Sequence, residues 1–72
     1  MNLLIFKTDI ENKEKVETIK PFLNNHSNII KWTIDLDDID NVLKVKFKKD
    51  LTENDIIKTI NTQGFYCDVL DY

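Results

Sequence analysis

Two segments of the chain, 29–36 and 42–48, alternate apolar with polar residues. A period of two places every second side chain on the same side of an extended chain, so both segments are predicted to be strands. The short acidic segment 37–41 between them predicts an antiparallel hairpin with one face toward a core and one toward water. The inward positions would be Ile30, Trp32, Ile34, Leu36, Leu43, Val45 and Phe47.

The orientation of this hairpin decides how Trp32 is interpreted. If its face packs against helices, Trp32 belongs to the core. If that face pointed away from them, an exposed aromatic and apolar surface would be an interface. The opposite positions, Lys31, Thr33 and Asp35, are polar, which favours the core.

Apolar residues at helical spacing predict a first helix over residues 13–25. Asn12 can accept a hydrogen bond from the first turn, and the apolar period begins after it. We therefore favour it as the N-cap over a capping box one turn earlier, formed by Thr8 and Glu11. Pro21 lacks an N–H, so we expect it to kink the helix or to interrupt its hydrogen bonding. The apolar stripe consists of Val16, Ile19 and Leu23, flanked by Lys20 and Phe22.

A second helix is predicted to begin after Thr52. Thr52 and Asp55 have the spacing of a capping box, with aspartate in place of the usual Glu or Gln. Gly64 suits the left-handed residue that ends many helices. The buried stripe would be Ile56, Ile57 and Ile60.

The remaining apolar segments predict a first strand over residues 3–8 and a last strand over residues 65–70. The first is apolar on both faces, which indicates a central strand covered at least partly on both sides. The last would place Phe65, Cys67 and Val69 on one face. The order strand, helix, strand, strand, helix, strand with right-handed crossovers predicts an α+β ferredoxin-like sandwich. Its four-stranded antiparallel sheet would carry both helices on one face, and residues 1–72 would form a single domain.

Composition limits the size of the core and indicates the cellular compartment. With 72 residues, 42% hydrophobic and 32% charged, the chain resembles a small soluble domain. A chain this short buries only about 60% of its unfolded surface, so we expect no deep cleft. It shows no apolar segment long enough to span a bilayer and no signal-peptide pattern. A lone cysteine cannot close an intramolecular disulfide, and we expect a cytoplasmic protein.

The charge balance argues against nucleic-acid and membrane partners. Ten lysines, no arginine and thirteen acids give a net charge of −3. Nucleic-acid binders usually show a basic stripe and arginine forks, and anionic membranes attract polybasic segments. The small cluster of Lys46, Lys48 and Lys49 is interpreted as a solvated strand end, because Asp50 and Glu53 follow closely.

Enzymatic chemistry has little support in the sequence. The single histidine and the single cysteine fall in different predicted elements, and one glycine cannot form a glycine-rich phosphate loop. We therefore expect no catalytic residues and no cofactor.

The acidic segment invites comparison with a calcium loop. An EF-hand counted from Asp35 would need glycine and glutamate at its sixth and twelfth positions, which hold Asp40 and Lys46. Asp and Asn also favour tight turns, and a hairpin turn is the preferred interpretation.

The chain resembles the heavy-metal-associated domains, the family of small copper chaperones and of modules in copper-pumping ATPases. The match covers nearly the whole chain and is similar to a bacterial branch of the family. No single motif is specific, and the order and spacing carry the resemblance. The residues that carry it are Phe6-Lys7-Thr8-Asp9-Ile10, Val16, Ile19, Pro21, Leu23, Ile30-Lys31-Trp32, Ile34-Asp35-Leu36, Val42-Leu43, Val45 and Gly64-Phe65.

The resemblance implies a Cys-x-x-Cys loop that binds Cu(I) between the first strand and the first helix. Thiolates suit this soft ion, and the helix dipole favours a thiolate at the second position. In this chain those two positions hold Asn12 and Lys15. An amide is a poor ligand for copper, and a lysine ammonium repels a cation. Cys67 matches no family ligand, and we expect Met1 and His26 at the end of the sheet away from Asn12.

Three functional hypotheses remain open. The first is a metallochaperone-like domain without a metal site that contacts a protein partner or a second copy. The resemblance implies that the contact uses the loop and the start of the first helix. Its residues would be Asp9, Glu11, Asn12, Lys13, Glu14 and Lys15.

The second hypothesis is copper binding or transfer through Cys67, which two chains of a dimer could share. The third is a small-molecule sensor with the same strand order, of the kind that binds amino acids between two copies. It ranks last, because such modules often carry a glycine in the loop after the first strand, and residues 9–12 contain none.

Overall fold

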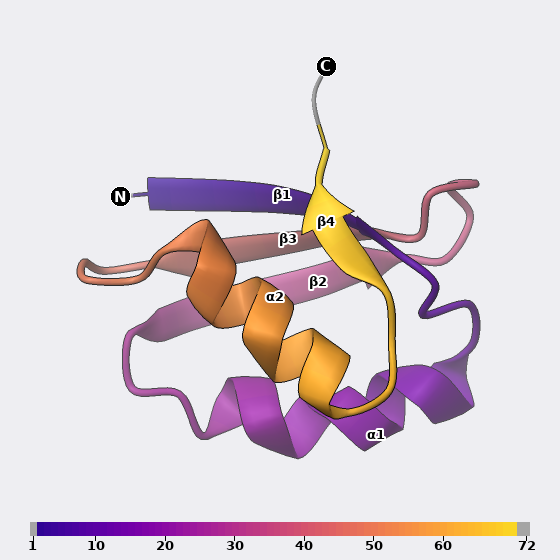
Figure 1. Ribbon diagram of the computed structural model, residues 1–72, viewed down its shortest axis with the longest axis horizontal. Helices are drawn as coiled ribbons and strands as arrows, with labels where there is room; N and C mark the ends of the chain where they lie inside the picture. Colours follow the sequence, from indigo (N-terminus) through magenta and orange to yellow (C-terminus); the bar gives the residue numbers. More distant parts are fainter. Residues whose placement is uncertain (1, 71–72) are drawn as a thin grey trace.

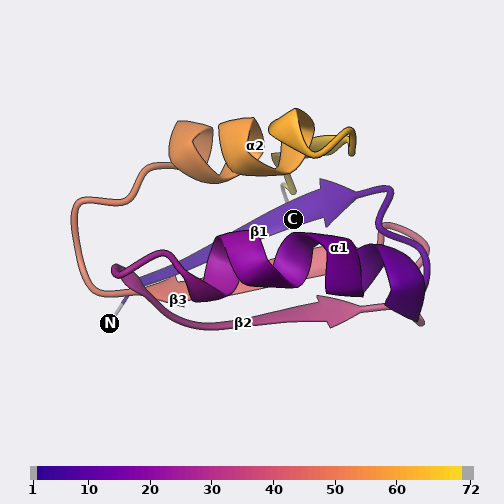
Figure 2. The same cartoon turned by 90° about the horizontal axis from the view of Figure 1, so that it is seen from below.

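The computed structural model describes residues 2–70, and Figure 1 shows a four-stranded sheet with two helices on one face. The sheet order is β2-β3-β1-β4, and every neighbouring pair is antiparallel. Viewed from below, α1 and α2 both lie on the same side of the strands (Figure 2). The predicted ferredoxin-like sandwich is confirmed. The elements are β1 (Asn2–Thr8), α1 (Lys13–Asn24), β2 (Ile29–Asp35), β3 (Val42–Phe47), α2 (Glu53–Thr62) and β4 (Cys67–Val69).

The strand register decides which side chains form the core. Phe6 on β1 lies opposite Leu43 on β3, and Trp32 on β2 lies opposite Val45. Residues in register on neighbouring strands share a face, so these side chains point together toward the helices. The buried core consists of Phe6, Ile10, Ile19, Leu23, Leu43, Val45, Phe47, Leu51, Ile56, Ile60 and Cys67.

Trp32 packs against this core, as the favoured interpretation held. Its indole is half-buried, and Nε1 donates a hydrogen bond to Oδ1 of Asn24 at 2.7 Å. The bond fixes the edge strand β2 to the end of α1 and satisfies the one polar atom of the ring.

The expectation that Ile30 faces inward is wrong. Ile29 lies opposite Phe47 and Lys31 lies opposite Lys46, so Ile30 is an extra residue in β2. Such a bulge breaks the alternation. As a result Ile29 packs against the core, whereas Ile30 is 51% exposed.

β1 is the central strand that the sequence predicts, but only one of its faces is covered by helices (Figure 2). Leu3 and Ile5 point to the other face, and Leu3 is 48% exposed. The second face is covered only in part, because Ile5 is half-buried whereas Leu3 is largely open to solvent. Side chains of neighbouring strands, such as Lys44 opposite Ile5, are what surround them.

The last strand is shorter than predicted. Phe65 and Tyr66 precede β4, and the Tyr66 amide donates to Oδ1 of Asp9 at 2.8 Å. Its hydrogen bond thus goes to a loop side chain, so pairing with β1 begins only at Cys67. Leu36 likewise belongs to the turn after β2.

The predicted helix ends are confirmed. Asn12 caps α1, and Thr52 and Asp55 form both bonds of the capping box of α2. Gly64 has φ of 89°, the left-handed conformation expected after a helix. Pro21 does not break α1, which continues to Asn24. Neither helix of the described chain is long and apolar enough to cross a bilayer.

Candidate functional site

The loop between β1 and α1 is where the resemblance places a metal site. Hydrogen bonds and a buried side chain hold this loop against the rest of the fold. Thr8 is buried, and its Oγ1 donates to the Asn41 carbonyl at 2.7 Å and accepts from the Ile10 amide at 3.1 Å. The Thr8 amide donates to the Asp40 carbonyl at 2.9 Å. Ile10 is fully buried and anchors the loop in the core. These contacts join the β1–α1 loop to the β2–β3 turn.

The side chains at the two expected cysteine positions are engaged in local structure. Oδ1 of Asn12 accepts from the Lys15 amide at 2.9 Å, which caps α1. Nζ of Lys15 lies 2.6 Å from Oε1 of Glu11. This hydrogen bond lowers the pKa of Glu11 and raises the pKa of Lys15. Both positions therefore serve the helix start, and neither presents a soft ligand.

A second contact joins the β1–α1 loop to a segment near the end of the chain. Oδ1 of Asp9 accepts from the Tyr66 amide, so the β1–α1 loop and the α2–β4 connection are held together. Asp9, Glu11, Asn12 and Lys13 are exposed and Lys15 is half-buried. We call Asp9, Glu11, Asn12, Lys13 and Lys15 the loop surface. The sixth predicted residue, Glu14, is also exposed, in the first turn of α1.

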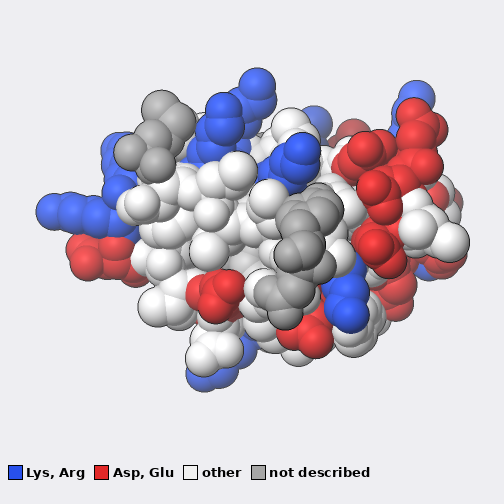
Figure 3. All heavy atoms as spheres, turned by 90° about the horizontal axis from the view of Figure 1, so that it is seen from above, with Lys and Arg blue, Asp and Glu red and all other residues white. Residues whose placement is uncertain are grey.

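Acidic side chains gather at this end of the molecule. In Figure 3 they form a cluster at the right, the end that in Figure 1 holds the β1–α1 loop and the β2–β3 turn. Within the turn, Oδ1 of Asp35 accepts from the Asp37 amide, and Oδ1 of Asp38 accepts from the Asp40 amide. These are the local bonds typical of Asp in turns, which confirms the interpretation as a hairpin turn.

Cys67 lies on β4, next to the end of β1, and not in the β1–α1 loop. It pairs with Thr8 across β1 and β4, faces the core and is 5% exposed. Burial, helped by the neighbouring charge of Asp68, raises the pKa of the thiol from 9.0 to about 12. At neutral pH the side chain is therefore a protonated thiol, whereas the metal-binding form is the thiolate.

The other soft or titratable candidates are elsewhere. His26 follows α1, at the opposite end of that helix from Asn12, as expected. Met1 lies outside the described residues. Within residues 2–70 no group of three or more His, Cys, Asp or Glu side chains is arranged to hold a metal ion.

The sequence interpretation did not find the two contacts that hold the loop, through Thr8 and through Asp9. Thr8 stands in an apolar strand at a position that faces the core, and that placement is the available signal for a buried, hydrogen-bonded hydroxyl. The Asp9 bond to Tyr66 links positions far apart in the chain, and no local pattern predicts it.

Comparison with known proteins gives matches in structure only. No described protein family and no curated protein matches the sequence. The chain is similar to the yeast copper transporter domain Ccc2a, with 22% identity over 99% of this chain and 97% of that one, at a TM-score of 0.83. A chain of the Atx1–Cu(I)–Ccc2a complex matches at 22% identity and a TM-score of 0.84, over 99% and 97% of the two chains.

A copper-binding domain of HMA7, a P-type ATPase, matches at 20% identity and a TM-score of 0.81, over 99% of this chain and 96% of that one. These proteins are metal-binding domains, and at such identities the likeness concerns the fold. The chain therefore has the ferredoxin-like fold of the heavy-metal-associated, copper-chaperone-like domains, without their Cys-x-x-Cys motif.

Proposed function

We propose that residues 1–72 act as one metallochaperone-like domain that carries no metal in its loop and binds a protein partner through the loop surface. The observation that carries this proposal is the engagement of Asn12 and Lys15, which serve as helix cap and ion-pair member where the fold's metal ligands would stand. The fold is retained, and the loop has become structural.

Two features of the loop surface support a role in protein contact. It is ordered by hydrogen bonds of Thr8 and Asp9, so a partner would meet a preformed surface and little ordering entropy would be lost. It also mixes acidic and basic groups, which favours a partner with a complementary arrangement of charge. Among proteins of this fold, Ccc2a is known in complex with Atx1.

The test compares three proteins as bait: wild type, Lys13→Glu with Lys15→Glu, and the control Lys49→Glu with Lys58→Glu. The control changes net charge equally but lies outside the loop surface. We expect a protein captured by wild type and by the control to be lost from the loop variant. Sedimentation of the same three proteins tests self-association. Unchanged capture and unchanged association in the loop variant would refute the proposal.

The alternative function, copper carried by Cys67 alone or shared across a dimer, is less well supported by this geometry. The thiol faces the core, is almost fully buried and has a raised pKa. If two chains shared this thiol, β4 would have to separate from the core residues that bury Cys67. A Cu(I) titration of the reduced protein against a chromophoric chelator, with Cys67→Ser beside it, distinguishes the two functions. One copper per two chains, lost in Cys67→Ser, would establish the alternative.

A further inference from the structure

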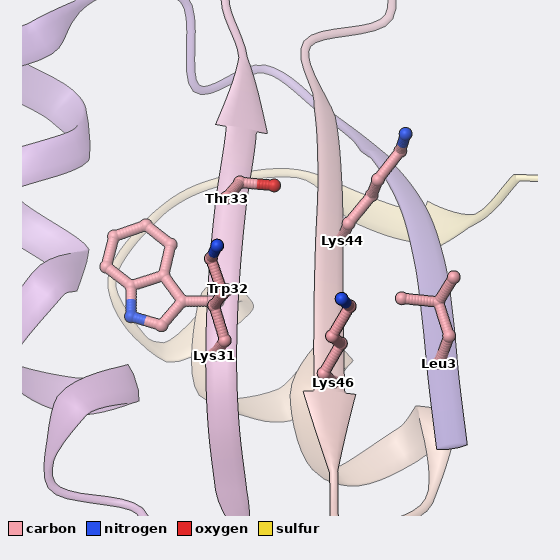
Figure 4. Close-up of a pocket in the computed structure, with 6 residues that line it drawn as sticks. All are labelled: Leu3, Lys31, Trp32, Thr33, Lys44 and Lys46. Atoms are coloured by element: carbon pink, nitrogen blue, oxygen red, sulfur yellow. The ribbon is translucent and has the colours of Figure 1, made fainter. Parts of the chain in front are cut away.

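The face of the sheet opposite the helices carries a shallow hollow of about 320 Å³. Side chains of three neighbouring strands surround it, and Figure 4 shows Lys31, Lys44 and Lys46 standing on β2 and β3 with Leu3 on β1. The indole of Trp32 points to the side, toward α1. We call Leu3, Lys31, Thr33, Lys44 and Lys46 the lysine face.

The three lysines of this face have no acidic neighbour across the strands. Lys31 lies opposite Lys46, which in turn lies opposite Leu3 on its other side. Lys44 lies between Thr33 and Ile5. The ion pairs found within residues 2–70 are Glu11–Lys15 and Glu17–Lys20, at the start and along the surface of α1.

One other lysine of the same face differs from these three in having an acidic residue opposite it. Lys7 on β1 lies directly opposite Asp68 on β4. Lys31 and Lys46 instead place two positive charges in direct cross-strand register, an arrangement that destabilises a sheet. In a chain whose acids outnumber its lysines, three neighbouring lysines without a described ion pair are a local asymmetry, and the acid that shares β2 with Lys31, Asp35, stands at the far end of that strand. A negatively charged ligand would relieve their repulsion.

The shape of the face favours an extended polypeptide over a small anion. All lining residues belong to the strands of one sheet, so no wall encloses a small molecule. Lys44 and Lys46 are two positions apart on β3, about 6.6 Å along an extended chain. Acidic side chains at alternate positions of an extended peptide have the same spacing. Leu3, 48% exposed beside them, offers an apolar contact.

We propose that the lysine face binds an extended acidic segment of a protein partner, with acidic residues at alternate positions and aliphatic residues between them. The charge complementarity of Lys31, Lys44 and Lys46 supplies the recognition. Among the described residues, those of the lysine face include no arginine and no stacked aromatic rings, the groups typical of nucleic-acid binding. This surface is separate from the loop surface, and the proposal stands or falls independently of the proposed function.

Fluorescence anisotropy with a labelled peptide of alternating glutamate and valine tests the proposal. We expect Lys44→Glu with Lys46→Glu to weaken binding by at least about tenfold, because two attractive charges become repulsive. The control Lys20→Glu with Lys58→Glu, on the helices that cover the other face, carries the same change in net charge, and its affinity should stay within about twofold, since distant exposed charges are screened. Amide chemical shifts should move at Lys31, Thr33, Lys44 and Lys46 and not in the loop surface.

Several results would overturn the proposal. The wild type could fail to bind the peptide, or both double variants could lose affinity equally, which would show a response to net charge alone. Binding of inorganic phosphate or phosphatidylserine vesicles without binding of the peptide would assign the face to another ligand. The milder pair Lys44→Gln with Lys46→Gln separates loss of attraction from loss of fold, and circular dichroism checks the fold of each variant.

Discussion

The loop surface and the lysine face differ in whether their polar groups already have partners. In the β1–α1 loop, the side chains of Asp9, Asn12 and Lys15 are all engaged in hydrogen bonds within the chain. On the sheet face, Lys31 and Lys46 lie opposite each other in the strand register, and no described acid forms an ion pair with them. The loop side chains therefore take part in hydrogen bonds within the chain, whereas the lysines of the sheet face have no ion-pair partner among the described residues.

The largest expected effect comes from returning thiolates to the loop. Asn12→Cys with Lys15→Cys, in a Cys67→Ser background, should withdraw Cu(I) stoichiometrically from a chromophoric chelator, whereas the parent Cys67→Ser protein should not. Two soft ligands would then flank a helix N-terminus, which favours the thiolate. The helix should lose about 1 kcal/mol with its Asn cap.

The matched control for that experiment is Asn12→Ala with Lys15→Ala in the same background, which removes the cap and the ion pair without adding sulfur. If the cysteine variant failed to withdraw copper, the loop backbone would itself have diverged from a metal-binding geometry.

A second experiment measures how far burial lowers the reactivity of the Cys67 thiol. With a pKa of about 12 in the folded chain against 9.0 as the ordinary value, its thiolate fraction near pH 8 is about a thousandfold below that of the unfolded chain. We expect native protein to react with a disulfide reagent slower by a similar factor than protein in denaturant. Equal rates would show that β4 opens freely.

The same thiol gives stability a pH dependence of known sign. Its pKa is raised on folding, so its contribution is complete below about pH 9 and is lost as the pH rises toward 12. Denaturant titrations across that range should show the loss in wild type. Cys67→Ala should remove this part of the alkaline sensitivity.

A third experiment compares one threonine from each region. Thr8→Val keeps the shape but leaves the Ile10 amide and the Asn41 carbonyl without their partner, which should cost about 1–3 kcal/mol of unfolding free energy. Thr33→Val changes an exposed residue of the lysine face and should stay within about 0.5 kcal/mol. Equal costs at the two positions would contradict the contrast between the regions.

The smallest expected effect is a gain. Lys46→Glu would place opposite charges across β2 and β3 where like charges now stand, and should stabilise the fold by about 0.5 kcal/mol. Lys46→Gln should give a smaller gain, and salt should reduce both. A loss of stability in Lys46→Glu, measured by denaturant titration at low salt, would mean that the like-charged pair is relieved in some other way.

Local patterns predicted most of the fold because they depend on neighbours in sequence. Asn12, Thr52 with Asp55, and Gly64 act within a few residues, and all three helix signals are confirmed. Ile30 and Tyr66 were misplaced because their positions depend on distant partners. Ile30 has no partner on β3, because Ile29 pairs with Phe47 and Lys31 pairs with the next residue, Lys46. Tyr66 does not join β4, because its amide donates to the side chain of Asp9.

The site was predictable in part for the same reason. The resemblance to heavy-metal-associated domains placed the expected cysteine positions at Asn12 and Lys15, and the sequence itself shows that neither is a cysteine. The roles of Thr8 and Asp9 arise where separate segments meet, as does the opposition of Lys31 and Lys46 across strands. Strand register and side-chain contacts determine these roles and this pairing, and a single sequence does not determine the register or the contacts.

The bulge at Ile30 also bears on how the chain avoids aggregation. β2 is an edge of the sheet, and an edge strand exposes backbone groups to which another chain can add. The extra residue interrupts the regular row of donors and acceptors near the start of that edge, and Lys31 follows it directly. Irregularity and charge are two means by which natural sheets discourage edge-to-edge growth. The residue that most clearly departs from the sequence pattern thus helps to keep the open edge from nucleating a larger sheet.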